Sequence, residues 1–69
     1  MNTKGKRERL VDAAFLLFHK HGVQTTSLAD IAKQADIPIG NVYYYFKTKD
    51  ELAMAVLDKY RTAFLAARS

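Results

Sequence analysis

The sequence has no cysteine, a single proline and only three glycines, and each shortage limits what the chain can form. Without cysteine, neither a disulfide nor a cysteine-bound zinc ion can stabilise this domain of 69 residues. A small hydrophobic core therefore has to stabilise the fold. Alanine, leucine and lysine are frequent and proline scarcely interrupts them, which favours an all-helical fold. Low-complexity linkers and internal repeats are absent from the sequence.

Long hydrophobic runs are missing as well. The longest strongly apolar run, Ala13–Phe18, is far shorter than the roughly 18 residues that a membrane span requires. The basic beginning of the chain is not followed by the core of a signal peptide. We therefore expect a cytoplasmic protein that does not bind membranes.

The residue patterns of enzymes and metal sites are also lacking. The sequence has no glycine-rich phosphate loop, no nucleophile with a convincing base and no pair of inward carboxylates, so we expect no enzyme and no cofactor. His19 and His21 are two residues apart on a predicted helix and face different directions, which argues against a shared metal ion.

Positive charge is concentrated at the start of the chain. The net charge is +4, and residues 4–9 form a basic arm in which four cations outnumber Glu8. These cations are Lys4, Lys6, Arg7 and Arg9. A basic arm suits a phosphate backbone or an anionic membrane surface, although basic termini commonly serve only to keep a chain soluble.

Apolar residues at intervals of three and four predict a first amphipathic helix from about Lys6 to Lys20, ended by Gly22. Its stripe consists of Leu10, Val11, Ala14, Phe15, Leu17 and Phe18. Leu16 lies on the otherwise polar face, where it either contacts a partner or is simply exposed.

Two capping boxes mark the starts of further helices. Ser27 with Asp30 opens a second helix, and Thr48 with Glu51 opens a fourth. Inward positions of the second helix are Leu28, Ile31, Ala32 and Ala35. On the fourth helix, Leu52, Val56, Tyr60 and Phe64 follow at intervals of four. The sequence ends with this helix still running.

A short third helix is predicted between these two. Asp36 occupies the position after the second helix where a left-handed backbone is usual, and Pro38 forces Ile37 out of the helical region. In the third helix, Ile39, Val42 and Phe46 form a stripe that can pack on the first two helices. The predicted order is helix, turn, short helix, longer helix.

The third helix carries residues suited to DNA. A helix-turn-helix places the start of such a helix in the major groove, which is about 12 Å wide. Gly40 permits close approach but could be a mere turn glycine, and Asn41 can bind adenine but could be merely solvated. The consecutive tyrosines 43–45 point about 100° apart and cannot all enter one core.

Cations and aromatic hydroxyls complete this candidate surface. Tyr43 and Tyr45 would flank the core with their hydroxyls free for phosphate oxygens, while Tyr44 projects furthest. Each ring could instead be a core tyrosine whose hydroxyl reaches solvent. Lys47 and Lys49 bracket the start of the fourth helix and make it a candidate anion site.

The sequence closely resembles the DNA-binding domain of the TetR family of bacterial transcriptional regulators. The segments that carry the resemblance are Ala13-Ala14, Leu17-Phe18, Gly22, Thr26–Ala32, Ala35–Ile37, Gly40–Phe46 and Lys49–Leu52. It departs from the family pattern at Asp36, where glycine is usual, and at Pro38, where a capping residue is common. The resemblance implies an all-α, homeodomain-like three-helix bundle with a helix-turn-helix, plus the start of a fourth, connecting helix.

Residue roles follow from the resemblance. The base-facing positions it implies are Ile39, Gly40, Asn41 and Tyr44, and the phosphate-contacting positions are Thr26, Ser27, Tyr43, Tyr45, Thr48 and Lys49. It makes residues 1–47 the helix-turn-helix domain and residues 48–69 the connecting helix to a missing C-terminal domain. That domain would form the homodimer and bind a small-molecule effector, and the partner would be double-stranded DNA at a palindromic operator.

Two other functions remain compatible with the residues alone. A small helical protein-protein interaction module would dock through Leu16 and part of the fourth helix, and replacing Tyr44 or Lys49 would then leave function intact. Peripheral membrane binding through the basic arm is the least favoured of the three functions, because the sequence has no strongly basic amphipathic face.

Overall fold

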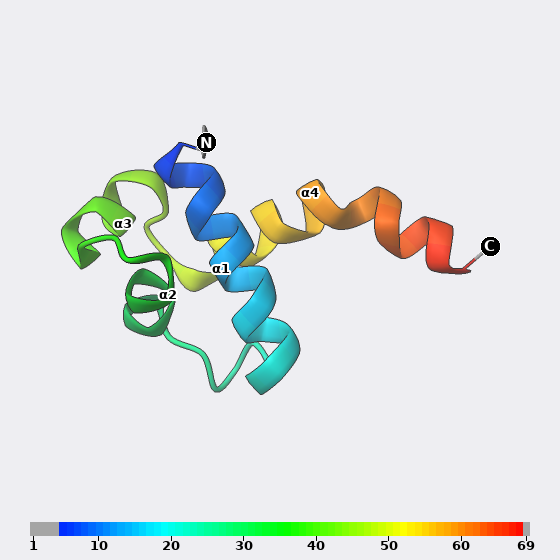
Figure 1. Cartoon of the computed structure of the whole chain (residues 1–69), viewed down its shortest axis with the longest axis horizontal. Helices are drawn as coiled ribbons and strands as arrows, with labels where there is room; N and C mark the ends of the chain where they lie inside the picture. Colours follow the sequence, from blue (N-terminus) through cyan, green and yellow to red (C-terminus); the bar gives the residue numbers. More distant parts are fainter. Residues whose placement is uncertain (1–4, 69) are drawn as a thin grey trace.

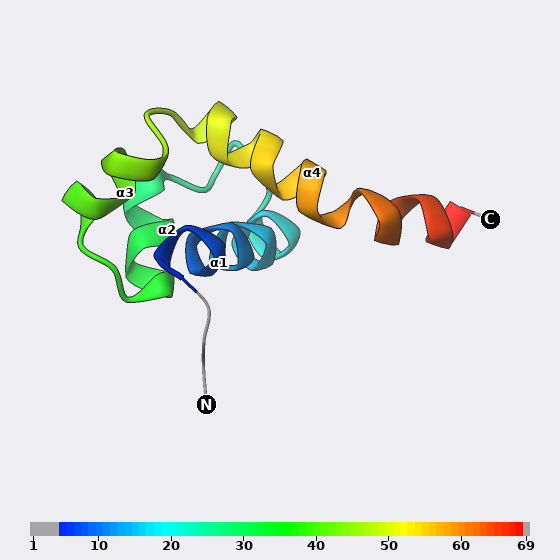
Figure 2. The same ribbon diagram turned by 90° about the horizontal axis from the view of Figure 1, so that it is seen from above.

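The part of the chain that the structure describes forms four helices, which confirms the all-α prediction. The computed structural model describes residues 5–68, with side chains up to residue 61, and no strand occurs in this part of the chain. The helices are α1 Lys6–His21, α2 Leu28–Ala35, α3 Ile39–Tyr45 and α4 Lys49–Arg68. Figures 1 and 2 show α1, α2 and α3 as a compact group from which α4 extends, with α3 and the far end of α4 at opposite ends.

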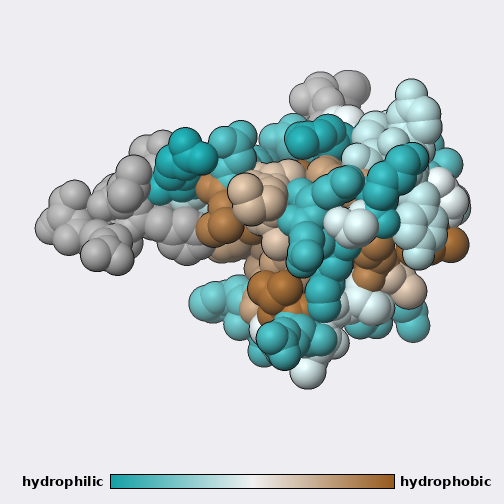
Figure 3. All heavy atoms as spheres, turned by 180° about the vertical axis from the view of Figure 1, so that it is seen from behind, coloured by the Kyte–Doolittle hydropathy of each residue, from teal (hydrophilic) through white to brown (hydrophobic). Residues whose placement is uncertain are grey.

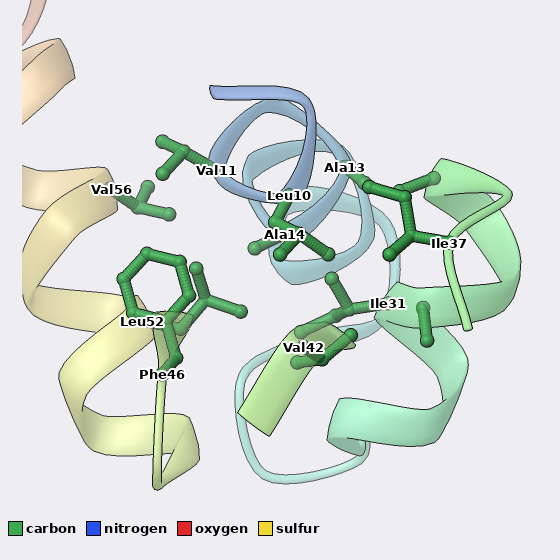
Figure 4. Packing of buried hydrophobic residues seen from close by; sticks show 12 residues of the cluster. Leu10, Val11, Ala13, Ala14, Ile31, Ile37, Val42, Phe46, Leu52 and Val56 are labelled. Carbon is green, nitrogen blue, oxygen red and sulfur yellow. The ribbon is translucent and has the colours of Figure 1, made fainter. Parts of the chain in front are cut away.

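The hydrophobic core lies where the four helices meet (Figure 4). Leu10 and Ala14 of α1, Ile31 of α2, Val42 of α3 and Leu52 of α4 are fully buried. They share one cluster with Val11, Ala13, Ala32, Ala35, Ile37, Phe46 and Val56. The first turns of α4 therefore belong to the same core as the helix-turn-helix, and this core extends past the predicted boundary between residues 47 and 48.

The start of α2 has the predicted capping box. The Ser27 hydroxyl accepts a hydrogen bond from the Asp30 amide at 3.1 Å, and the Asp30 carboxylate accepts one from the Ser27 amide at 2.9 Å. The bonds from Ser27 hold the pKa of Asp30 below its usual value. Because this pKa is lower in the folded chain, the carboxylate stabilises the fold above its ordinary pKa, and this contribution is lost as the pH falls through the lowered value.

The capping box predicted at α4 is only half formed. The Thr48 hydroxyl accepts the Glu51 amide at 3.1 Å, as expected. The Glu51 carboxylate, however, accepts the amide of Lys47 at 2.9 Å rather than that of Thr48. The carboxylate reaches one residue further back, and it satisfies a different amide before the helix.

Two details of the predicted third helix were wrong. Ile39 does not join Val42 in the core, because Ile39 is 40% exposed and lies outside the buried cluster. Phe46 is buried but lies just after α3, in an extended conformation with φ of −137°. Ile37, in the turn before α3, is buried in the core instead.

The turn between α2 and α3 requires a left-handed residue. Asp36 has φ of 58° and ψ of 49°, the predicted conformation. The next amide, that of Ile37, donates to the Ala32 carbonyl at 2.9 Å and closes the end of α2. An aspartate here carries both a Cβ in a disfavoured region and a negative charge at the negative end of a helix.

We therefore expect Asp36→Gly to stabilise the chain. Removing the Cβ and the carboxylate should raise the free energy of unfolding by about 0.5 to 1 kcal/mol. Urea denaturation followed by circular dichroism measures the change. Gln34→Gly, at an exposed position inside α2, is the control and should lower stability by about 1 kcal/mol. A lower midpoint for Asp36→Gly would show that its carboxylate makes a favourable contact.

Side chains of α1 and α4 fix the direction in which α4 leaves the bundle. The Lys59 ammonium donates to Asp12 at 2.6 Å and to Glu8 at 2.9 Å, and these two carboxylates raise its pKa. Tyr60 donates its hydroxyl to Asp12 at 2.7 Å and stacks on Phe15, with ring centroids 4.1 Å apart. Tyr60 thus continues the predicted stripe of α4, whereas the side chain of the next predicted member, Phe64, lies outside the described residues.

Candidate DNA-binding surface

One side of α3 is exposed although several of its residues are apolar or aromatic. Val42 is fully buried, whereas Ile39 is 40% exposed and Tyr44 is 78% exposed. Gly40 is exposed and Asn41 is half-buried. Ile39, Gly40, Asn41 and Tyr44 thus share one short helix at the end of the molecule opposite to the outgoing end of α4 (Figures 1 and 2).

Gly40 has no evident role inside the molecule. It lies within α3 rather than in a turn, and its φ is not positive. A Cβ built on it would meet no atom within 4 Å. Glycine lowers helix stability relative to alanine, and nothing in this fold requires it here. The turn-glycine interpretation is therefore wrong, and no packing contact of the described residues accounts for a glycine at this position.

The three tyrosines differ in their surroundings. Tyr45 packs partly against the core, and its ring meets that of Tyr44 edge-on, with centroids 5.0 Å apart. Tyr43 is 48% exposed and is more open than the sequence suggested. At least one exposed tyrosine was predicted, and the helix exposes two.

Hydroxyl groups stand at the starts of α2 and α4. Ser27 and Thr48 are exposed, and each uses its oxygen to accept an amide of its own helix. A hydroxyl that accepts can still donate its hydrogen, so both remain able to donate to a phosphate oxygen. Thr26 differs, because it is only 3% exposed and donates its hydroxyl to the Gly22 carbonyl at 2.8 Å.

Lys47 and Lys49 are both tied to backbone carbonyls. The Lys49 ammonium donates to Val23 at 2.7 Å, and the Lys47 ammonium donates to Tyr43 at 3.0 Å. The Lys49 contact brings the start of α4 to the loop that leads into α2. Each ammonium has two further hydrogens, and both lie next to a helix start that favours anions.

The sequence did not reveal a set of contacts from the first turns of α1 to the helix-turn-helix. Lys6 donates to the Asn41 side-chain oxygen at 3.2 Å, and Arg9 donates to the Ala35 carbonyl at 2.6 Å. The Arg7 guanidinium lies over the Phe46 ring, 5.1 Å from its centroid. These partners are far apart along the chain, so no local pattern could have indicated them.

Other kinds of site find little support in the described residues. No group of histidine and acidic side chains there could hold a metal ion. Both histidines are exposed, and His19 stacks loosely on Phe15 with centroids 6.4 Å apart. No helix in the same part of the chain combines the length and the hydropathy needed to cross a membrane.

Apolar surface also occurs away from α3. Figure 3 shows hydrophobic atoms next to the grey end of α4. Exposed apolar side chains include Leu16, as predicted, and Met54 and Leu57 of α4, which are 66% and 52% exposed. A groove between α1, the following loop and α4 is lined by Phe15, Phe18, His19, Val23, Ala53 and Leu57. Of these positions, Leu16 and Leu57 are the ones that the interaction-module hypothesis requires.

Comparisons with known proteins identify relatives that are transcriptional regulators of the helix-turn-helix type. The family described as bacterial regulatory proteins, tetR family, matches residues 10–56. The chain is 44% identical over 52 residues to the HTH-type transcriptional regulator TtgR of Pseudomonas putida, covering 75% of this chain and 25% of that protein. It is 38% identical over 60 residues to the HTH-type transcriptional repressor ComR of Escherichia coli, covering 87% of this chain and 29% of that one.

A solved structure agrees with this assignment. The TetR family protein CprB from S. coelicolor A3(2) superposes with a TM-score of 0.79 at 31% identity, covering 96% of this chain and 35% of CprB. The present chain thus spans about a third or less of these relatives. Proteins of this family are transcriptional regulators and not enzymes. The chain belongs to the tetR family of bacterial regulatory proteins, which are DNA-binding transcriptional regulators with a helix-turn-helix.

Proposed function

We propose that this chain is the operator-reading part of a ligand-responsive repressor that binds a palindromic site through the major groove. The observation that carries the proposal is the open side of α3, where Ile39 and Tyr44 are exposed and a Cβ on Gly40 would meet no atom of the molecule within 4 Å. The similarity to a protein described as a repressor supports the direction of regulation.

The proposed base-facing residues are those on the open side of α3. Ile39 would contact a thymine methyl, Gly40 would let the helix approach closely, and Asn41 and Tyr44 would meet base edges. Ser27, Tyr43, Tyr45, Thr48 and Lys49 would bind phosphates from both sides of α3. Thr26 remains in this set as a prediction, but its hydroxyl would have to leave the Gly22 carbonyl before it could donate to a phosphate.

The remaining proposals concern the full-length protein. Because the chain spans only part of its relatives, we propose that residues 48–69 connect to a C-terminal domain that forms a homodimer and binds a small-molecule effector. Two reading helices would then enter successive major grooves about 34 Å apart. Effector binding would change the direction of α4 and thereby the distance between the two reading helices. We propose that the protein acts in the cytoplasm, at the nucleoid.

The first test is the salt dependence of DNA binding. Fluorescence anisotropy of a labelled mixed-sequence duplex, titrated with this chain over a salt series, gives the slope of log K against log salt. We expect Lys49→Ala to weaken binding on all duplexes and to lower the slope by about one unit, because one phosphate contact is lost. Tyr43→Phe should weaken binding without changing the slope, because it removes a neutral donor.

Lys20→Ala is the matched control, because it removes one exposed cation from the far end of α1. Its slope should stay close to that of the unmodified chain. Equal slopes for the Lys49 and Lys20 variants would count against a phosphate contact at the start of α4. Binding that survives Tyr44→Ala and Lys49→Ala but is lost in Leu57→Glu would favour the protein interaction module.

A further inference from the structure

Lys6 makes a contact that restricts how Asn41 can read a base. Its ammonium lies 3.2 Å from the Asn41 side-chain oxygen, and α1 thereby touches the open side of α3. An ammonium group can only donate, so the partner has to be the carbonyl oxygen of the amide and not its nitrogen. The contact therefore fixes which branch of the planar amide faces α1. The NH₂ group, on the other branch, is directed away from Lys6.

The residues that follow Lys6 tie the first turns of α1 to the helix-turn-helix. Arg7 lies over the Phe46 ring just after α3, and Arg9 donates to the Ala35 carbonyl at the end of α2. The hydrogen bond from Arg9 to Ala35 is part-buried and is therefore partly shielded from solvent. The first turns of α1 thus contact the end of α2, the open side of α3 and the residue after α3. The basic arm, as far as it is described, is part of the helix-turn-helix and not a loose extension.

We propose that Lys6 determines specificity by orienting the amide of Asn41, an inference that rests on the proposed reading of bases by α3. A free asparagine reads adenine with both ends of its amide, accepting from N6 and donating to N7. Because Lys6 holds the oxygen toward α1, the NH₂ group is the part of the amide that faces outward. Asn41 then favours an edge that presents acceptors, such as N7 and O6 of guanine or O4 of thymine.

Three substitutions separate the hydrogen bond from the charge. Lys6→Met removes both, and Lys6→Gln removes the charge but keeps an N–H donor. Lys20→Met removes a charge at the far end of α1, away from α3. Asn41→Ala is tested beside these variants. Bound sites are first selected from a randomised duplex pool with each protein. The base preference at each position is then measured on duplexes that differ from the selected site by one base pair. Circular dichroism confirms that every variant is folded.

At the base pair where Asn41→Ala relaxes the preference, we expect Lys6→Met to shift the preference toward adenine by roughly fivefold or more. Lys6→Gln should keep the original preference, and Lys20→Met should change no preference. If Lys6→Met weakens all duplexes equally, or if Lys6→Gln shifts the preference as Lys6→Met does, Lys6 acts only through its charge and the inference is overturned. If Asn41→Ala relaxes no position, the base-reading role proposed for Asn41 fails, and this inference fails with it.

Discussion

Gly40→Ala is expected to stabilise the chain and at the same time to weaken its binding to DNA. Alanine favours a helix over glycine, and the added Cβ would meet no atom of the molecule within 4 Å. The free energy of unfolding should therefore rise by about 0.5 to 1 kcal/mol. At a DNA interface the same methyl group would occupy space between α3 and the groove.

The expected loss of affinity for a selected operator is about tenfold or more, equivalent to the cost of overpacking a close contact. Urea denaturation and anisotropy on the same samples measure the two effects. Because stability and affinity move in opposite directions, unfolding cannot explain the loss of binding. An alanine variant that binds as tightly as the unmodified chain would show that α3 does not approach DNA at Gly40, and the main observation behind the proposed function would be lost.

Leu52→Ala is expected to unfold much of the chain. Leu52 is fully buried in the common core, although it belongs to α4. Truncating a buried leucine costs roughly 2 to 5 kcal/mol. A domain of this size with neither disulfide nor metal seldom has more than about 3 to 5 kcal/mol of stability. The loss is therefore comparable with the whole stability of the fold.

Leu57→Ala provides the matched control, because it is the same substitution on the same helix at a side chain that is 52% exposed. Its effect should stay within about 0.5 kcal/mol. Thermal and urea unfolding of both variants measure the difference. If the two variants were equally stable, α4 would not form part of the core, and the folded unit would end near Lys47.

Much of the fold was predictable because its signals are local. The capping box of Ser27 and Asp30, the left-handed turn at Asp36 and the end of α1 at Gly22 each depend on neighbouring residues. Periodicity likewise identified the buried faces of α1 and α2. Where several local choices compete, prediction was less successful: Ile37 rather than Ile39 enters the core, and Glu51 bonds to the Lys47 amide.

The candidate site was predictable in its location but not in its internal contacts. The sequence by itself determined the helices, the capping box of α2, the exposed tyrosines of α3 and the resemblance to a family, since these depend on residues close together along the chain. Only the tertiary structure decided that Lys6 meets Asn41, that Lys49 holds the loop at Val23, and that Lys59 and Tyr60 fasten α4 to Asp12. The physical reason is that a long, flexible side chain can reach many partners, and packing of the helices decides which partner lies within hydrogen-bonding distance.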